Sequence, residues 1–424
     1  MRRNIKFLLF VVLVSGLFIS CNNKHKGMKS EYKTASEILG DPNYPAISYG
    51  GYRHKTRQTQ PTLDEIKEDL KILAALGFKI LRTYNLQFDH APNILKAIRQ
   101  LKTEDSTFEM YVMLGAWIDC KDAWTESPNH QQENEAANTL EIEKAVKMAN
   151  LYPDIVKIIS VGNEAMVHWA WSYHVRPGII LKYVTYLQNL KTTQKLPKDL
   201  WVTSSDNFAS WGGGDSSYHQ PDLEALAHAV DYISVHTYPF HDTYHNPGFW
   251  EINSEDTKGL SDIESINVLM GRASDYAISQ YHSVKKYISH LGVKKPIHIG
   301  ETGWASDSGD MFNINGSRAA DQYKQALYFK NIVSWANKNN ISCFYFEAFD
   351  ESWKDPNNSK GSENHFGLIT VDGKVKYALW DSFDQGIFNG LSRSGKAISK
   401  TFEGNPDNLF ISVLPPTIIE SQMN

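Results

Sequence analysis

Two glutamates of this 424-residue chain follow sequence patterns that are typical of catalytic carboxylates. Glu164 ends the string Val-Gly-Asn-Glu, and Glu301 lies within Ile-Gly-Glu-Thr-Gly-Trp. Each follows a short β-branched apolar run, residues 156–161 or residues 297–299, of the kind that forms buried parallel strands. In an α/β barrel, catalytic residues collect at the C-terminal ends of the strands. A pair of carboxylates at that end of the barrel suits the cleavage of a glycosidic bond.

The retaining mechanism of glycoside hydrolysis uses two carboxyl groups about 5–5.5 Å apart, one as acid/base and one as nucleophile. We expect Glu164 at the end of the fourth strand and Glu301 at the end of the seventh, so that they face each other across the barrel mouth. The alternative is that each glutamate pairs with a structural cation such as Arg82 or Lys354. The presence of both, with Asn before the first and Gly-Trp after the second, favours the catalytic interpretation.

Eight short apolar runs alternate with helical stretches, which predicts βα units and a parallel sheet. Eight such units in one domain indicate a single (β/α)8 TIM barrel of the α/β class. Helical spacing is clearest over residues 62–76, where Thr62 and Glu65 form a capping box and Gly77 suits the C-terminal stop. Residues 117–138 and 241–250 are predicted to be long loops over the catalytic face. The strands are predicted to start near Ile47, Lys79, Met110, Val156, Leu200, Tyr232, Pro296 and Ser342.

The N-terminus has the pattern of an export signal. Basic residues precede an apolar stretch over residues 7–19 that is too short for a comfortable transmembrane helix. Ser20-Cys21 resembles a bacterial lipobox, so we predict that residues 1–20 are a lipoprotein signal peptide and that Cys21 is lipidated. Simple secretion with cleavage nearby is the alternative. These features predict a lipid-anchored protein of the bacterial cell envelope, on the periplasmic face or the cell surface. We expect it to be a monomer.

The mature chain is predicted to have three parts. Residues 21–43 are polar and are expected to be a lipid-anchored tether. Residues 44–385 are predicted to form the catalytic barrel. Residues 386–424 are predicted to be a C-terminal extension that packs on the barrel rather than a second domain.

The composition excludes several other classes of protein. The net charge is −5 and no long basic run occurs, which argues against nucleic-acid binding. After Cys21 only Cys120 and Cys343 remain, too few for a disulfide framework. No zinc spacing or HExxH pattern is present, so we predict neither a metal nor an organic cofactor. The 11 tryptophans suit either a carbohydrate cleft or ordinary core packing.

At these motifs the chain resembles family 17 glycoside hydrolases, over most of residues 46–380. The resemblance rests on motifs that occur in the family's order. They are the first two strands at 47–50 and 80–84, the acid/base motif at 161–164, the nucleophile motif at 300–304, and the acidic and lysine segment at 346–354 and 363–368. Two departures occur: Ala305 stands where the family commonly has proline, and Val235-His236-Thr237 replaces an asparagine-containing run.

The resemblance implies roles for individual residues. Glu164 is implied to be the acid/base, Glu301 the nucleophile, and Asn163 the partner of the sugar 2-hydroxyl, while Tyr238 is implied to lie near the nucleophile. For the aromatic groups the alternative is core packing, and for the charged groups it is a surface ion network. The other implied substrate-binding or orienting groups are Tyr84, Trp304, Phe349, Phe366, Glu351, Lys354 and Glu363. Some of Trp117, Trp124, Trp169, Trp171, Trp211 and Trp250 are expected to build further sugar subsites.

The function implied by the resemblance is that of a retaining endo-β-1,3-glucanase, a hydrolase that degrades laminarin-like polysaccharide. A glucanosyltransferase that uses the same glycosyl-enzyme is an alternative, since a sugar could replace water as the acceptor. A third possibility, from another class, is a lipoprotein that captures glycans without cleaving them. The presence of both Glu164 and Glu301 argues against this third class.

Overall fold

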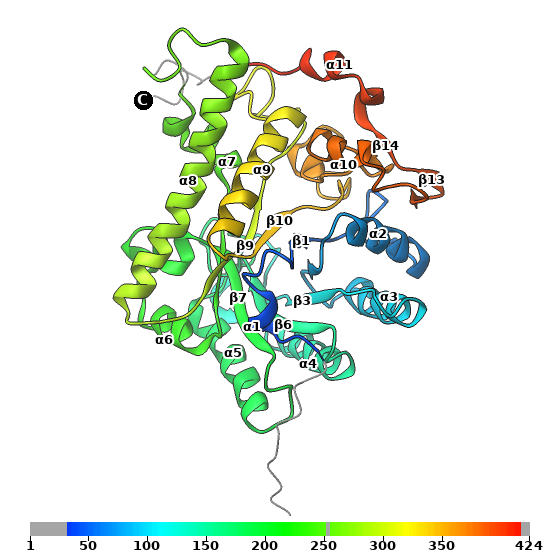
Figure 1. The fold of residues 1–424 in the computed structure, drawn as a ribbon. Coiled ribbons are helices and arrows are strands. Elements are labelled where there is room, and N and C mark those ends of the chain that lie inside the picture. Colours follow the sequence, from blue (N-terminus) through cyan, green and yellow to red (C-terminus); the bar gives the residue numbers. More distant parts are fainter. Residues whose placement is uncertain (1–31, 252–254, 417–424) are drawn as a thin grey trace, which may run out of the picture. The chain divides into compact units, whose positions relative to one another are not determined.

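The computed structural model describes residues 32–251 and 255–416, and its elements belong to one compact unit that begins at Thr34. Eight parallel strands close a barrel in the order β1-β10-β9-β8-β7-β6-β3-β2, with helices around it (Figure 1). The predicted single (β/α)8 barrel is therefore confirmed. The barrel strands are β1 (Ala46–Ser48), β2 (Ile80–Arg82), β3 (Tyr111–Ala116), β6 (Val156–Asn163), β7 (Trp201–Asn207), β8 (Ile233–His236), β9 (Ile297–Gly303) and β10 (Cys343–Phe346).

Each predicted strand start lies within one residue of the observed start. The strands could be predicted because both of their faces are covered, so their sequences are nearly continuous apolar runs. Cys120 and Cys343 are both buried free thiols. No helix in the described part of the chain is long and apolar enough to cross a membrane.

The helices follow the predicted alternation with the strands. In α2 the predicted capping box is confirmed: Thr62 N donates to Glu65 Oε2 at 2.8 Å, and Glu65 N donates to Thr62 Oγ1 at 3.2 Å. Gly77 follows with a φ of +86°, a backbone conformation that favours glycine. The helices are α1 (Ala35–Ile38), α2 (Leu63–Ala75), α3 (His90–Glu104), α4 (Glu135–Leu151), α5 (Pro177–Thr192), α6 (Pro221–Ala229), α7 (Pro239–His245), α8 (Asp262–His290), α9 (Gln322–Lys338), α10 (Trp380–Asp384) and α11 (Pro406–Phe410).

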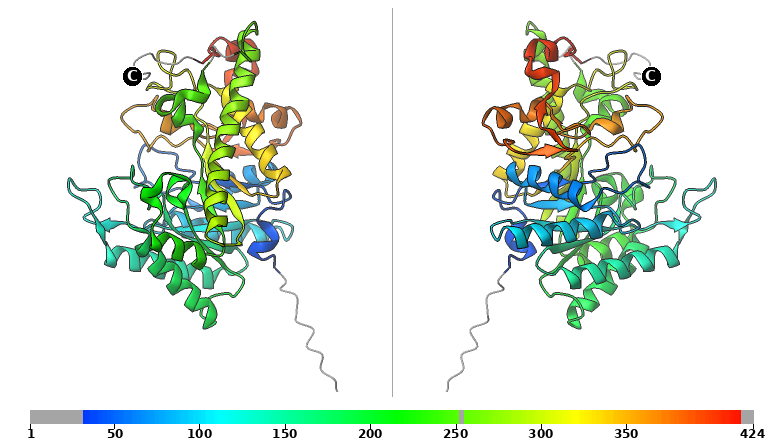
Figure 2. Two further views of the ribbon diagram at one scale, coloured as in Figure 1. Left: turned by 90° about the vertical axis from the view of Figure 1, so that its left-hand side faces the viewer. Right: turned by 90° about the vertical axis from the view of Figure 1, so that its right-hand side faces the viewer.

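The two predicted long βα loops are present as long connections between strands and helices, but each contains short regular elements that were not predicted. Residues 241–250 fall in α7 and in a 3-10 helix, Pro247–Trp250. Proline at the first helical position starts each of these short helices, because its fixed φ suits a helix and its missing N–H costs nothing there. Residues 117–138 contain an antiparallel hairpin of β4 (Cys120–Lys121) and β5 (Asn129–Glu133). The 29-residue α8 takes up nearly half of the connection between β8 and β9 and is the long light-green helix in the left view of Figure 2.

The predicted tether ends earlier than residue 43. Residues 1–31, including the predicted signal peptide and Cys21, lie outside the described residues. From Thr34 the chain is folded: the side chains of Ala35, Ile38 and Leu39 are buried in an apolar cluster with β1 and β2 residues. Gly40 N also donates to Ser342 Oγ at 2.8 Å. The apolar residues within 34–43 therefore belong to the barrel, and the boundary is corrected to Thr34.

A buried ionic cluster joins the first helical layer to the C-terminal segment. Asp69 of α2 is fully buried and accepts hydrogen bonds from Tyr49 Oη at 3.1 Å, Arg53 Nη2 at 3.0 Å and Arg393 Nε at 2.9 Å. Arg393 lies in a small hairpin of β12 (Ser392–Arg393) and β13 (Lys396–Ala397), while β11 (Lys374–Val375) pairs with β14 (Ser399–Lys400). A buried carboxylate is tolerated only with such pairing, so this cluster fixes the C-terminal segment on α2.

Candidate active site

Glu301 of β9 is a buried carboxylate surrounded by hydrogen-bond donors. Arg82 at the end of β2 donates to its Oε2, as does Tyr84 Oη at 2.8 Å, and Tyr238 Oη donates to its Oε1 at 2.7 Å. Burial alone would raise the pKa of Glu301, but the Arg82 guanidinium and the two tyrosine hydroxyls outweigh burial and hold the pKa below its usual value. Glu301 is therefore ionised at neutral pH.

Glu164, at the end of β6, has the opposite electrostatic environment. Its backbone lies in the left-handed region, at a φ of +46°, and its N–H donates to the Ser205 carbonyl at 3.0 Å. Burial and then the negative charge of Glu301 raise the pKa of Glu164 to about 8, although Arg82 opposes the shift. Two neighbouring carboxyls whose pKa values are driven apart are the pattern of an acid paired with a base or nucleophile.

His236, at the end of β8, supports Glu164 from within the barrel. Its Nδ1 lies 3.0 Å from Glu164 Oε1, and its Nε2 lies 2.8 Å from Ser205 Oγ, which is in turn 2.8 Å from Ser234 Oγ. Burial lowers the pKa of His236 to about 3, so the imidazole is neutral. The departure from the family pattern at this residue therefore creates a positioning group for Glu164. Sequence reasoning noted the histidine but did not assign it a role.

Gly300 shows how tightly the serines below the carboxylates are packed. A Cβ atom on Gly300 would lie 2.0 Å from Ser234 Oγ and 2.4 Å from Ser205 Oγ. Any side chain at this position would displace the hydrogen-bonded serines that hold His236. The glycine before Glu301 is thus explained by close approach between neighbouring strands.

Arg82 connects the two motifs. Beside Glu301, it donates to the Gly300 carbonyl at 2.8 Å and to Asn163 Oδ1. The structural alternative considered for Glu301, pairing with Arg82, is therefore also observed. The ion pair does not replace the catalytic interpretation, because it lies inside the cleft and supplies the positive charge that keeps Glu301 ionised. Sequence reasoning missed Arg82 as a site residue, although an arginine that ends a buried strand is an available signal.

A cleft of about 460 Å³ opens at the C-terminal ends of the strands. Glu164 does not line this cavity directly, but it lies within electrostatic reach of Glu301, which does. Tyr238 does not line it either and contacts Glu301 from beside the cleft. The structure thus brings together most of the residues implied by the resemblance. Those that line the cavity are Tyr84, Asn163, Glu301, Glu351, Lys354 and Glu363.

Trp304 lies outside the cleft, so its prediction as a sugar-binding residue is wrong. Its side chain is fully buried, its Nε1 donates to the Ala319 carbonyl at 2.8 Å, and its ring packs against Trp250 and Tyr328. Successive strand side chains alternate between faces, so a residue three positions after the inward-facing Glu301 points outward, into the layer between barrel and helices. For the same reason of burial, Phe349, Phe366, Trp211 and Trp250 are core residues.

Lys354 lies in the cleft as part of a buried network rather than on a solvated surface. Its Nζ donates to Glu347 Oε1 at 2.8 Å, lies 3.8 Å from Glu351 Oε2, and is 3.7 Å from the centre of the Phe346 ring. Burial raises the pKa of Glu347 despite the neighbouring ammonium group. Glu363 is more exposed and pairs with His241 Nε2 at 3.2 Å. Glu347 was missed, because a glutamate within an apolar run carries no spacing signal.

An aromatic wall forms one end of the cleft. The rings of Trp124 and Tyr173 stack with centres 5.0 Å apart, and the Trp117 ring lies 5.0 Å from that of Tyr173. Trp353 and Tyr52 also line the cavity. Flat, partly exposed rings of this kind suit the apolar faces of sugars. No cluster of three or more metal-ligating side chains was found among the described residues.

Comparison with known proteins identifies the family. The model of the BtgE/BtgC glycoside hydrolase domain matches residues 46–367. The solved endo-laminarinase from Formosa Hel1_33_131 is 58% identical, with a TM-score of 0.90 over 92% of this chain and 98% of that one. The family 17 β-1,3-glucanosyltransferase of Rhizomucor miehei shares the fold at 21% identity and a TM-score of 0.54, over 79% of this chain and 96% of that one.

A curated relative extends the comparison to fungi. The probable glucan endo-1,3-β-glucosidase btgC of Aspergillus flavus is 25% identical over 334 residues, which is 75% of this chain. This chain spans 40% of the length of that fungal protein. The resemblance to family 17 glycoside hydrolases is confirmed, and the chain belongs to the BtgE/BtgC glycoside hydrolase family.

Proposed function

We propose that this protein is a retaining endo-β-1,3-glucanase that cleaves internal bonds of laminarin-like glucan. The observation that carries the proposal is the pair of neighbouring carboxyls in opposite environments. Three donors surround Glu301 and lower its pKa, whereas burial and the charge of Glu301 raise the pKa of Glu164. The similarity to a solved endo-laminarinase at 58% identity supports the substrate class. A protein that only captured glycans would have no need of both carboxyls in these states.

In the proposed mechanism Glu301 attacks the anomeric carbon while Glu164 donates its proton to the leaving oxygen. The bond to the leaving sugar breaks, and a glycosyl ester of Glu301 forms. Esterification removes the negative charge of Glu301, which is one cause of the raised pKa of Glu164. The pKa of Glu164 then falls, so the same residue can take a proton from the incoming water, which releases the sugar with retained configuration.

The pH dependence of kcat/KM is expected to be bell-shaped. Activity requires ionised Glu301, whose pKa is lowered, so the acid limb lies below the ordinary glutamate range of about 4.3. Activity also requires protonated Glu164, so it falls as the pH rises through about 8. Initial rates on soluble glucan across the pH range measure both limbs. A profile that already declines from about pH 5 upward, where an unperturbed glutamate is ionised, would contradict the proton-donor role of Glu164.

The product sizes from linear β-1,3-glucan test the reaction directly. Oligosaccharides of mixed length should appear early, because an open cleft allows cleavage at internal bonds. A single small product from the outset would instead show exo action. Products longer than an oligosaccharide substrate would show glucanosyl transfer. If the protein does not cleave linear β-1,3-glucan, the proposed substrate class is wrong.

We also propose that the protein is a lipoprotein of the bacterial cell envelope, anchored through Cys21. The basic and apolar pattern of residues 1–20, followed by Ser20-Cys21, supports this proposal. In a bacterial host, the wild-type chain should fractionate with membranes and incorporate labelled fatty acid. Cys21→Ser should lose the label and accumulate either as the unprocessed precursor or in the soluble fraction. A labelled Cys21→Ser variant would show that the anchor lies elsewhere.

A further inference from the structure

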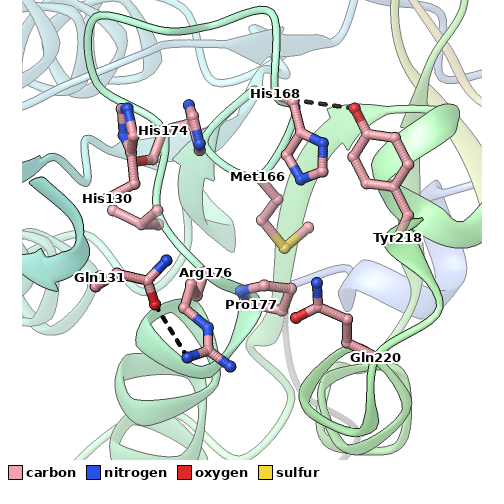
Figure 3. Close-up of a pocket in the computed structure, with 10 residues that line it drawn as sticks. His130, Gln131, Met166, His168, His174, Arg176, Pro177, Tyr218 and Gln220 are labelled. Carbon is pink, nitrogen blue, oxygen red and sulfur yellow. Dashed lines mark hydrogen bonds between the residues drawn. The ribbon is translucent and has the colours of Figure 1, made fainter. Parts of the chain in front are cut away.

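The loop that follows Glu164, residues 164–176, separates the catalytic cleft from a second hollow. Tyr173 on this loop lines the cleft, whereas His168 and His174 on the same loop line a separate pocket of about 340 Å³. Figure 3 shows this outer pocket, which is also lined by His130 of β5 and by Tyr218, a residue of the connection between β7 and α6. Glu164, the acid/base candidate, is the first residue of this loop, so the loop links Glu164 to both hollows.

Two tryptophans stand exposed on this loop. Trp169 is 62% exposed and Trp171 is 54% exposed, whereas Trp211, Trp250 and Trp304 are fully buried. We call Trp169 and Trp171 the tryptophan crest. Large aromatic side chains are usually well buried, so a local group of exposed ones marks an interaction surface.

The tryptophan crest is connected to the aromatic wall of the cleft. Trp124 of the wall, itself 61% exposed, donates its backbone N–H to the Ser172 carbonyl at 2.8 Å. Its ring stacks on Tyr173, two residues after Trp171. Trp171 also lies edge-on to His130 of the outer pocket, with ring centres 6.3 Å apart. The backbone of the loop therefore joins the aromatic wall of the cleft to the tryptophan crest, and the ring of Trp171 joins the crest to the outer pocket.

The chemistry of the outer pocket suits an uncharged, hydroxyl-rich ligand. The rings of His130 and His174 stack at 3.6 Å, and those of His168 and Tyr218 at 4.2 Å, so two stacked aromatic pairs line the pocket (Figure 3). Burial lowers the pKa of His174 to about 4, so this imidazole is neutral. Among the described lining residues Arg176 supplies a positive charge, which is offset because Asp222 Oδ2 lies 4.0 Å from its Nη2. His130 Nδ1 lies 2.8 Å from the His174 carbonyl oxygen, which holds the two imidazoles together.

We propose that the tryptophan crest and the outer pocket form a second carbohydrate-binding surface that holds a stretch of β-1,3-glucan outside the catalytic cleft. The ligand class rests on the proposed function, and continuity with the cleft wall favours a glucan over any other occupant. A polymer held beside the cleft is present there at a high effective concentration. The surface therefore lowers KM for long glucans, while an oligosaccharide that fills only the cleft gains nothing.

Binding and turnover test this surface together. In the Glu301→Gln background, which removes turnover, the double variant Trp169→Ala/Trp171→Ala should bind soluble linear β-1,3-glucan about tenfold more weakly in affinity electrophoresis, since two aromatic contacts are lost. The matched control is Tyr186→Ala, which removes an exposed aromatic side chain from α5, outside both hollows. With Glu301 intact, the double variant should raise KM for the polymer more than KM for a short oligosaccharide. His168→Ala tests the outer pocket separately and should also weaken polymer binding.

The outcomes distinguish this surface from the proposed function. If Glu301→Gln binds polymer and the double variant binds it equally well, the tryptophan crest is not a glucan site, although the proposed function stands. If Glu301→Gln binds no β-1,3-glucan at all, both proposals fail. An unchanged affinity for His168→Ala would remove the outer pocket from the site. A wild-type dimer that the double variant converts to monomer, with glucan binding unchanged, would show that the crest joins two copies of the chain.

Discussion

Glu301→Gln is expected to lower kcat on β-1,3-glucan by at least about 10⁴-fold, while the protein still binds the glucan. The amide cannot attack the anomeric carbon, so no glycosyl-enzyme forms. The aromatic wall of the cleft does not depend on the charge of Glu301, so binding persists. The measurement combines reducing-sugar release over long incubations with affinity electrophoresis on the same sample.

The control for Glu301→Gln must separate lost chemistry from lost structure. Removing the charge leaves Arg82 without its anionic partner, although Arg82 still donates to the Gly300 carbonyl and to Asn163. A thermal unfolding curve therefore accompanies the assay. Glu104→Gln is the matched variant, because it changes an exposed carboxylate at the end of α3, outside the cleft, and should retain turnover. Turnover by Glu301→Gln comparable to the wild type would exclude Glu301 as the nucleophile.

Glu164→Ala is expected to lower kcat on glucan by about 10²–10⁴-fold, the usual contribution of general acid–base catalysis. A substrate with a good leaving group, such as a dinitrophenyl glycoside of a β-1,3-oligoglucan, needs no proton to depart, so it should still form the glycosyl-enzyme. That intermediate should then accumulate, because no base activates water. A burst of dinitrophenol followed by slow turnover reports both steps.

Added azide gives the decisive test of Glu164. Azide is a nucleophile that needs no base, and it should occupy the space left by the missing side chain. It should therefore restore turnover of the dinitrophenyl substrate and yield the β-glycosyl azide, identified by its NMR coupling constant. Glu224→Ala, at an exposed site on α6, serves as a control. Its turnover of the dinitrophenyl substrate should match that of the wild type, both with and without azide. If Glu164→Ala does not react with the dinitrophenyl substrate and azide does not restore turnover, Glu164 is not the acid/base.

The fold could be predicted from sequence because parallel strands are buried on both faces. Their apolar runs gave starts within one residue of those observed, and the cap of α2 was visible in Thr62, Glu65 and Gly77. The helices in residues 239–250 were missed because those segments are short and rich in polar and aromatic residues. The start of the folded unit was placed too late because the few apolar residues of 34–43 showed no clear periodicity.

The candidate site was predictable only where a motif carried the information. Residues at strand ends, such as Glu164, Glu301 and Tyr238, could be placed together because the barrel gathers those ends. Trp304 was misplaced because an aromatic residue after a strand suits either a cleft or a core. Only the direction in which its side chain points decides between them. The hydrogen bonds of His236 join β8 to β6 and β7, which are far apart in sequence, so no local pattern reveals its contact with Glu164.

The contact between Asp69 and Arg393 makes the stability of the first βα unit depend on the C-terminal segment. All barrel strands are present by Phe346, yet Arg393 follows Asp69 by 324 residues. A chain that stops shortly after the barrel leaves the buried carboxylate of α2 without one of its two guanidinium partners. Its first βα unit then opens more readily, and local opening exposes a chain to proteolysis. The C-terminal hairpin thus completes the pairing of Asp69, and we expect a chain truncated before Arg393 to be cleaved by proteases faster than the full chain.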